Sequence, residues 1–192
     1  MGTPTRSRGA RRAEILDAAA RLFAERGFHG VSIEDLGAAV GVSGPAIYRH
    51  FSGKEALLAE MLLDVSSRLH AGAADLVTVA ATPLEALEAL VGAHIAFSLG
   101  EPHLITVHDR ELGNVPEPQR RQIRRLQRLY VEEWVTVLTE VRPGVPAPRL
   151  RAATHAVFGL LNSTPHSAGE LSGEDAAALL YTLAHTVLVS VR

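Results

Sequence analysis

Residues 32–51 read SIEDLGAAVGVSGPAIYRHF, and two very short helices are predicted within them. Ser32 is a suitable N-cap for the first helix, because an aspartate three residues later takes the place of the usual capping-box glutamate. Gly41 ends this helix after barely two turns. Ser43 is placed to cap the second helix, and Pro45 lies in its first turn, where a missing N–H costs nothing. Two short helices joined by so tight a connection predict a helix-turn-helix.

The second of these helices is the expected DNA-reading element, because such a helix lies in the major groove with its N-terminal residues against base edges. Small residues at its start let the backbone approach the bases, and Tyr48, His50 and Lys54 carry groups that can meet phosphates. The alternative is that these polar side chains merely solvate a small helical head. The predicted DNA-binding residues are Ser32, Ser43, Gly44, Pro45, Ala46, Tyr48, Arg49, His50 and Lys54.

The rest of the chain is also predicted to be helical, so the fold class is all-α. Apolar residues recur at helical spacing in nearly every long segment, and no sustained alternation indicates a half-buried strand. Gly27 is a stop signal, and Thr82-Pro83 is a cap followed by an N1 proline. About nine helices are expected, at 9–26, 33–40, 44–51, 54–80, 83–99, 102–112, 117–142, 147–169 and 173–191. We expect a DNA-binding head over residues 9–69 and a ligand-binding and dimerisation domain over residues 70–192.

Composition excludes several classes of protein. The chain has 192 residues, of which 47% are hydrophobic and 21% charged, as in ordinary globular proteins. No apolar run approaches the roughly 18 residues of a membrane span, and no apolar stretch follows the N-terminal arginines as in a signal peptide. The absence of cysteine excludes disulfides, thiolate nucleophiles and cysteine metal sites. We therefore expect a cytoplasmic protein with no membrane partner. The predicted DNA-binding role places it at the nucleoid, and no cofactor is expected.

Charge is distributed unevenly along the chain. The formal net charge is −2, but residues 1–54 carry +3 and residues 55–192 carry −5. A basic head joined to an acidic body is typical of a DNA-binding protein. Near the N-terminus, a group of arginines is expected either to track phosphates or the minor groove, or to form a charged, disordered terminus. These arginines are Arg6, Arg8, Arg11 and Arg12.

An ordered set of residues runs from the first predicted helix to the start of the fourth: Ile15-Leu16-Asp17-Ala18-Ala19, Leu22-Phe23, Gly27-Phe28, Ser32, Ile33, Leu36, Ala39, Gly41-Val42-Ser43, Ile47-Tyr48, His50-Phe51 and Lys54-Glu55-Ala56-Leu57. This set resembles the TetR family of bacterial repressors. The resemblance implies a homodimer that binds a palindromic double-stranded DNA operator and is released by a small-molecule inducer. It also implies a dimer interface on the last two helices and an inducer pocket among helices four to eight. The chain departs from many relatives at Gly44-Pro45, where they carry a lysine or arginine beside the glycine.

The last two predicted helices each carry a broad apolar stripe. Either stripe could be ordinary core, but together at the C-terminus they suit an isologous two-fold interface. The stripes are Leu150, Ala153, Val157, Phe158, Leu160 and Leu161 on one helix, and Leu180, Leu183, Ala184, Val187, Leu188 and Val191 on the other.

The predicted helix at 117–142 has two contrasting faces. On one face, Tyr130 and Trp134 are either core or cavity lining. The opposite face carries Arg121, Arg124, Arg125 and Arg128 within a sector of about 100°. These arginines are either a solvated face, helped by pairs such as Arg128 with Glu132, or an anion clamp at a pocket mouth.

Together with His108-Asp109-Arg110-Glu111, this helix resembles TetR-type regulators that sense acyl-CoA thioesters, which bury an apolar tail and bind the nucleotide end with basic residues. The expected inducer is therefore an acyl-CoA or another apolar carboxylate derivative. A polar island at 162–166 contains Pro165, which should kink its helix, and the island could line the pocket, cross the dimer interface or face water. The predicted ligand-binding residues are Phe97, His108, Arg121, Arg125, Arg128, Tyr130, Trp134, Phe158 and Asn162.

Two other classes of function remain as alternatives. A metal-dependent enzyme would need a site such as His103 and His108 with Asp109 or Glu111, but that spacing matches no standard ligand pattern. We therefore predict no metal site and no enzyme. A ligand-independent architectural DNA-binding protein would show weak sequence preference, a steep salt dependence and no response to small molecules. The favoured mechanism is a population shift, in which ligand stabilises a spacing of the two heads that no longer fits successive major grooves.

Overall fold

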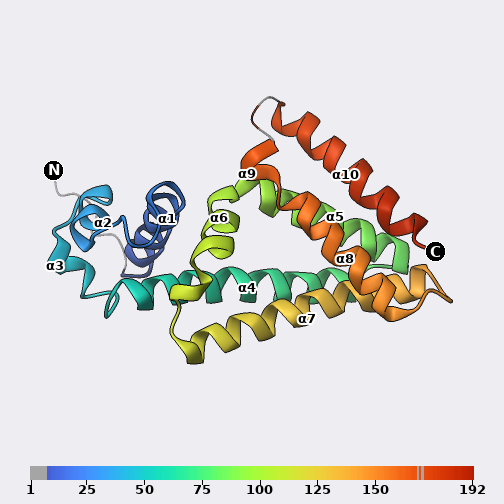
Figure 1. Ribbon diagram of the computed structural model, residues 1–192, viewed down its shortest axis with the longest axis horizontal. Helices are drawn as coiled ribbons and strands as arrows, with labels where there is room; N and C mark the ends of the chain where they lie inside the picture. The colour runs from blue at the N-terminus through green and yellow to red at the C-terminus, as the bar shows by residue number, and fades with distance from the viewer. Residues whose placement is uncertain (1–7, 168, 170) are drawn as a thin grey trace.

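The structure is a computed structural model that describes residues 8–167, 169 and 171–192, and these residues form an all-helical molecule (Figure 1). The N-terminal head consists of α1 (Arg8–Arg26), α2 (Ile33–Ala39) and α3 (Gly44–Ile47). A long helix, α4 (Lys54–Val79), leaves the head and runs through the body alongside α7 (Glu117–Val141). The remaining elements are α5 (Pro83–Gly100), α6 (Pro102–Glu111), a 3-10 turn η1 (Leu112–Asn114), α8 (Ala147–Leu161), α9 (Thr164–Ser167) and α10 (Gly173–Ser190).

Local sequence signals account for most of the helix ends. Gly27 and Gly41 follow α1 and α2 with φ of 74° and 69°, in the left-handed region that favours glycine. The predicted capping box is present, because the Ser32 hydroxyl accepts from the backbone of Asp35 and the Asp35 carboxylate accepts from the backbone of Ser32. Ser43 occupies the N-cap position of α3 without a side-chain capping bond.

Two predicted helices are shorter in the structure. Helix α3 ends at Ile47, because the following N–H groups of Arg49 and His50 bond three residues back and form a turn. The prediction of a single helix at 147–169 was wrong. The segment is broken into α8 and α9, with Asn162 and Ser163 in the turn between them.

Packing inside the body explains the break after α8. The side chain of Asn162 reaches His94 of α5, with 3.0 Å between Oδ1 and Nε2. Thr164 is buried and its hydroxyl donates to the carbonyl of Ser98 at 2.9 Å. Pro165 lies in the first turn of a new short helix, α9, instead of bending the old one. The polar island thus lies partly against α5, while His166 is exposed.

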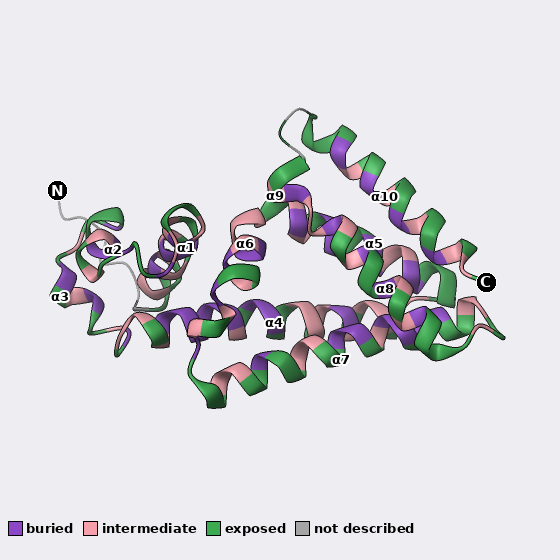
Figure 2. Ribbon diagram, viewed as in Figure 1, coloured by how far each residue is buried: buried purple, intermediate pink, exposed green. Residues whose placement is uncertain are grey.

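Buried side chains form two apolar clusters (Figure 2). The head cluster contains Phe23, Leu36 and Ile47, and it also takes in residues of the body: Leu104, Val107, Val115 and Ile123. The body cluster surrounds Trp134, and Leu69 of α4 packs against both clusters. Helix α4 is continuous across residue 69, so no linker separates the head from the body at that point.

Helix α10 has a buried face and an exposed face (Figure 2). Ala176, Leu180, Ala184 and Leu188 are buried, and α10 packs on α5 and α8. The adjacent stripe of Leu179, Leu183 and Val187 is exposed. Among the described residues, no helix combines the length and the apolar character needed to span a membrane.

Candidate DNA-binding and ligand-binding sites

The structure exposes most of the residues predicted to meet DNA. Tyr48 directly follows α3 and is 58% exposed. Ser32, Ser43, Pro45 and Arg49 are exposed as well, although the hydroxyl of Ser32 is engaged in the capping box. Ala46 and His50 are half-buried. Ser43, Pro45, Tyr48 and Arg49 therefore lie exposed on and beside α3, while Ser32 is at the N-cap of α2.

Two of the predicted residues have structural partners instead of open surface. Gly44 is buried, and a Cβ added to it would lie 3.2 Å from the carboxylate of Glu34. The Lys54 ammonium donates to the carbonyls of Phe28 and Val31, both at 2.6 Å, and lies 4.4 Å from the centre of the Phe28 ring. The Lys54 ammonium thus links the start of α4 to the turn after α1 and is not presented to a phosphate in this structure, while Gly44 is enclosed beside Glu34 of α2.

The predicted basic arm is only partly described. Arg6 and the side chain of Arg8 lie outside the described residues. Arg11 and Arg12 belong to α1, where Arg11 donates to the carbonyl of Val40 at 3.0 Å. Arg12 pairs with Glu60 of α4 and lies 4.3 Å from the centre of the Phe51 ring. These two arginines therefore stabilise the head instead of extending from it.

A cavity of about 280 Å³ lies in the body, among α4, α5, α6, α7 and α8. Five of the predicted ligand-binding residues line it: Phe97, His108, Tyr130, Phe158 and Asn162. The prediction missed its other polar lining residues, which are Ser66, His94, Asp109, Gln127 and His155. Trp134 does not line the cavity, because it is wholly buried in the wall behind Tyr130 and Phe158.

His94 is at the centre of the buried polar groups and is 3% exposed. Its Nδ1 lies 3.0 Å from the Tyr130 hydroxyl and its Nε2 lies 3.0 Å from Oδ1 of Asn162. Its ring stacks on Phe158, with centroids 4.8 Å apart. Burial lowers the pKa of His94 to about 4, against an opposing effect of the hydrogen bond with Asn162. The ring is therefore neutral at physiological pH. One signal for it was available, because His94 interrupts an otherwise apolar run at 90–97.

The neutral state of His94 predicts a loss of stability in mild acid. In the unfolded chain a histidine takes up its proton near pH 6.5, whereas folded His94 does so near pH 4, so protons favour the unfolded state between these values. We expect about 2 to 3 kcal/mol of the free energy of unfolding to be lost between pH 7 and pH 4.5. Urea unfolding at constant protein concentration measures this.

The matched control for this prediction is a histidine on the surface. His94→Gln should flatten the pH dependence, while His166→Gln, at an exposed position on α9, should leave it as in the wild type. Equal pH profiles for the wild type and His94→Gln would contradict the assignment.

The predicted anion clamp does not line the cavity. Arg121, Arg125 and Arg128 are exposed on α7, as is Arg124. The solvated-face alternative named the wrong pair, because Glu132 binds Arg151 of α8 through two hydrogen bonds, of 2.7 and 2.8 Å, and not Arg128. This carboxylate faces the neighbouring helix, where a guanidinium can bind both of its oxygens.

Helix α6 joins the cavity to the head. Leu104, Ile105, His108 and Asp109 line the cavity. Directly after Asp109, Arg110 donates to the carbonyl of Ala24 at 3.1 Å, and the buried Glu111 accepts from the backbone N–H of Phe28 at 3.2 Å. Because Lys54 binds the carbonyl of the same Phe28, the turn after α1 is held by both α4 and α6.

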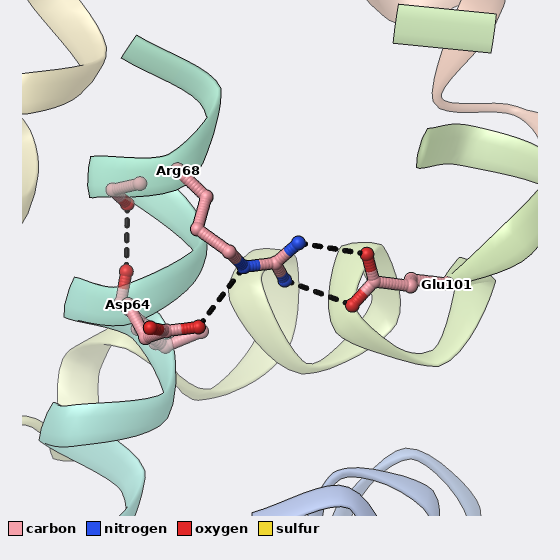
Figure 3. Close-up of polar contacts among 5 residues, drawn as sticks. Asp64, Arg68 and Glu101 are labelled. Carbon is pink, nitrogen blue, oxygen red and sulfur yellow. Dashed lines mark hydrogen bonds and ion pairs between the residues drawn. The ribbon is translucent and has the colours of Figure 1, made fainter. Parts of the chain in front are cut away.

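The start of α6 is also attached to α4 (Figure 3). Arg68 of α4 donates to both carboxylate oxygens of Glu101, at 2.9 and 3.1 Å, and to Asp64 at 3.0 Å. The hydrogen bonds with Glu101 raise the pKa of Arg68. A smaller cavity of about 170 Å³ lies beside this group, between α1 and the body.

The histidines of the alternative enzyme site are separated. His103 lines the smaller cavity, while His108 contacts Gln127 and Asp109. Within the part of the chain that the structure describes, no three His, Asp or Glu side chains gather as metal ligands would.

Comparison with known proteins covers both parts of the chain. Residues 15–61 match the family described as "Bacterial regulatory proteins, tetR family", and residues 80–188 match "Tetracyclin repressor-like, C-terminal domain". Over 133 residues the chain is 31% identical to the HTH-type transcriptional repressor KstR2 of Mycobacterium tuberculosis, a match covering 68% of this chain. The matched region spans 66% of that repressor, just under two thirds of its length.

Solved structures share the architecture over nearly the whole chain. A TetR-family transcriptional regulator from Bordetella parapertussis 12822 superposes with a TM-score of 0.80 at 26% identity, covering 91% of this chain and 93% of that one. The transcriptional regulator FadR from Bacillus subtilis, solved in complex with stearoyl-CoA, gives a TM-score of 0.75 at 21% identity, covering 94% and 98%. At that identity the second match shows the fold alone.

Proposed function

The chain belongs to the TetR family of bacterial regulatory proteins, which are transcription regulators and not enzymes, and we propose that it is a dimeric repressor released from its operator by a small apolar ligand. The observation that carries this proposal is the position of α6. Residues 104–109 of this helix contribute to the lining of the body cavity, and the next two residues, Arg110 and Glu111, are hydrogen-bonded to the head. A ligand that displaces α6 would therefore move the turn at Phe28 and, with it, α1 and α4.

A dimer is required by this mechanism, because two heads must reach half-sites about one DNA turn apart. The exposed stripe on α10 supports a two-fold interface with α8 and α10 of a second copy. Ligand would then change the spacing of the heads by a population shift. A repressor of this kind would work at the nucleoid, in the cytoplasm.

An acyl-CoA is the ligand class we propose. The cavity is mostly apolar and accepts an acyl chain, while a volume of about 280 Å³ leaves the nucleotide outside. Around the axis of α7, Arg124 and Arg128 are the arginines nearest in angle to the residues that line the cavity. Arg125 is farther from them in angle. The two nearer arginines are placed to meet phosphates outside the cavity. The stearoyl-CoA complex of FadR, a protein of the same fold, supports this class.

The experiment has two stages. A duplex is first selected from randomised DNA with the purified protein, and its release is then followed by fluorescence anisotropy against short, long and aromatic acyl-CoAs, fatty acids and aromatic drugs. A palindromic duplex that is released by one of these compounds supports the proposal. Weak sequence preference, a steep salt dependence and no release by any compound would instead favour the architectural alternative.

Replacing Tyr48 tests the DNA-facing surface. Tyr48→Ala should weaken binding of the selected duplex about tenfold, because each of two heads loses an exposed hydroxyl and ring worth roughly 0.7 kcal/mol. Val79→Ala, at an exposed position at the far end of α4, is the matched control and should bind like the wild type. If both variants bind equally well, Tyr48 does not contact DNA.

A further inference from the structure

The polar cluster in the cavity has a defined direction of hydrogen bonding. The amide oxygen of Asn162 can only accept, so Nε2 of His94 carries the proton and donates to it. Nδ1 of His94 is then an acceptor, and the Tyr130 hydroxyl donates to it. The hydroxyl proton of Tyr130 is therefore already engaged in a hydrogen bond. The amide NH₂ group of Asn162 remains available as a donor, because it makes no hydrogen bond to any described residue.

The charge of the cavity lining restricts what this NH₂ group can bind. Among the described residues that line the cavity, none is a lysine or arginine, and Asp109 contributes a carboxylate. His94 stays neutral at physiological pH because burial depresses its pKa to about 4. An ionised carboxylate beside the cluster would therefore be buried without a counter-ion, which is unfavourable. A neutral carbonyl oxygen needs only a donor.

We infer that the cavity selects the uncharged acyl group of a thioester or ester over the free carboxylic acid, with the carbonyl oxygen accepting from the amide of Asn162. This inference rests on the proposed function, since it concerns the same cavity. Phe97, Phe158 and Tyr130 surround the apolar part of the ligand. His94 acts as a positioning residue, because its hydrogen bond fixes the amide of Asn162 with its NH₂ group directed away from the ring.

The test compares ligands that share one carbon skeleton. Isothermal titration at about pH 7.5 uses octanoate, methyl octanoate and octanoyl-CoA as one set, and phenylacetate, methyl phenylacetate and phenylacetyl-CoA as the other. At this pH both acids are ionised. The methyl ester and the thioester of at least one set should bind at least tenfold more tightly than the corresponding acid. This comparison uses the wild-type protein, so it does not depend on the folding of any variant.

Substitution of the donor provides the second measurement. Asn162→Asp keeps the size of the side chain but replaces the NH₂ donor with a carboxylate oxygen, so the ester and the thioester should each bind at least tenfold more weakly. Ser163→Ala is the matched control, because Ser163 lies beside Asn162 in the turn after α8 but does not line the cavity, and its hydroxyl donates to the carbonyl of Leu160. This control should bind within twofold of the wild type.

Two results would overturn the inference. One is that the acid binds as tightly as its ester in every set of compounds that shows binding. The other is that none of the six compounds binds at concentrations up to about 1 mM. Failure of the proposed function is separable, because the titrations contain no DNA. If the neutral compounds bind but leave the selected duplex bound, the ligand class stands and the release mechanism fails.

Discussion

Replacing Leu183 with glutamate is expected to convert the protein into monomers and to weaken binding of the selected duplex at least a hundredfold. Leu183 lies in the middle of the exposed stripe of α10, between Leu179 and Val187. A leucine that becomes buried contributes about 1.5 to 3 kcal/mol. Across a two-fold axis each substitution occurs twice, so the dimer should lose at least roughly 3 kcal/mol, or more than about a hundredfold in its dissociation constant.

The loss of DNA binding follows from the loss of the dimer, because a monomer reaches only one half-site. Sedimentation equilibrium measures the first effect and fluorescence anisotropy the second. Leu84→Glu is the matched control. Leu84 is 44% exposed and Leu183 is 43% exposed, but Leu84 lies in the first turn of α5. A Leu183→Glu protein that remains dimeric at micromolar concentration would show that this stripe is not the interface.

Sequence patterns located the helices well where the signal was local. Gly27, Gly41 and the capping box at Ser32 each act within a few residues, so the ends of α1 and α2 could be predicted from their neighbours alone. The break after α8 could not, because it depends on contacts of Asn162 and Thr164 with α5, more than sixty residues away. Pro165 in that segment predicted that the helix would be disturbed, but not that it would break into two helices.

In the candidate sites, too, local features could be predicted from the sequence, whereas contacts between distant residues could not. Tyr48 is exposed, as its predicted contact with DNA requires, and it directly follows the buried Ile47 of α3. Lys54 was expected at a phosphate, but a charged side chain at a helix start can equally turn inward when carbonyls such as those of Phe28 and Val31 are within reach. His94 was missed because its importance comes from Tyr130 and Asn162, which only the fold brings together.

Gly37 leaves no room for a side chain between α2 and the start of α3, and Gly37→Ala is expected to weaken duplex binding about a hundredfold. A Cβ at this position would lie 2.7 Å from the carbonyl oxygen of Val42, 2.9 Å from the backbone nitrogen of Gly44 and 3.0 Å from the carbonyl carbon of Ser43. All three are backbone atoms of the connection between α2 and α3, so they cannot move aside as a flexible side chain could. The two helices must separate.

This separation should cost each head about 1 to 3 kcal/mol, the usual effect of overpacking. It also displaces α3, and the proposed close approach of this segment to the bases depends on the small residues Ser43, Pro45 and Ala46. A loss of about 1.4 kcal/mol per head is tenfold, and two heads give the hundredfold effect on binding. Anisotropy with the selected duplex measures this loss, and urea unfolding measures the cost to stability.

Gly72→Ala is the matched control for this prediction, because a Cβ at that position in α4 would meet no heavy atom within 4 Å. The same change in an unobstructed helix interior should stabilise the protein by roughly 0.5 to 1 kcal/mol. The two substitutions therefore have opposite signs for one physical reason, the space available to a methyl group. If Gly37→Ala instead bound the duplex like the wild type, the close contact between α2 and the start of α3 would not set the position of the DNA-facing helix.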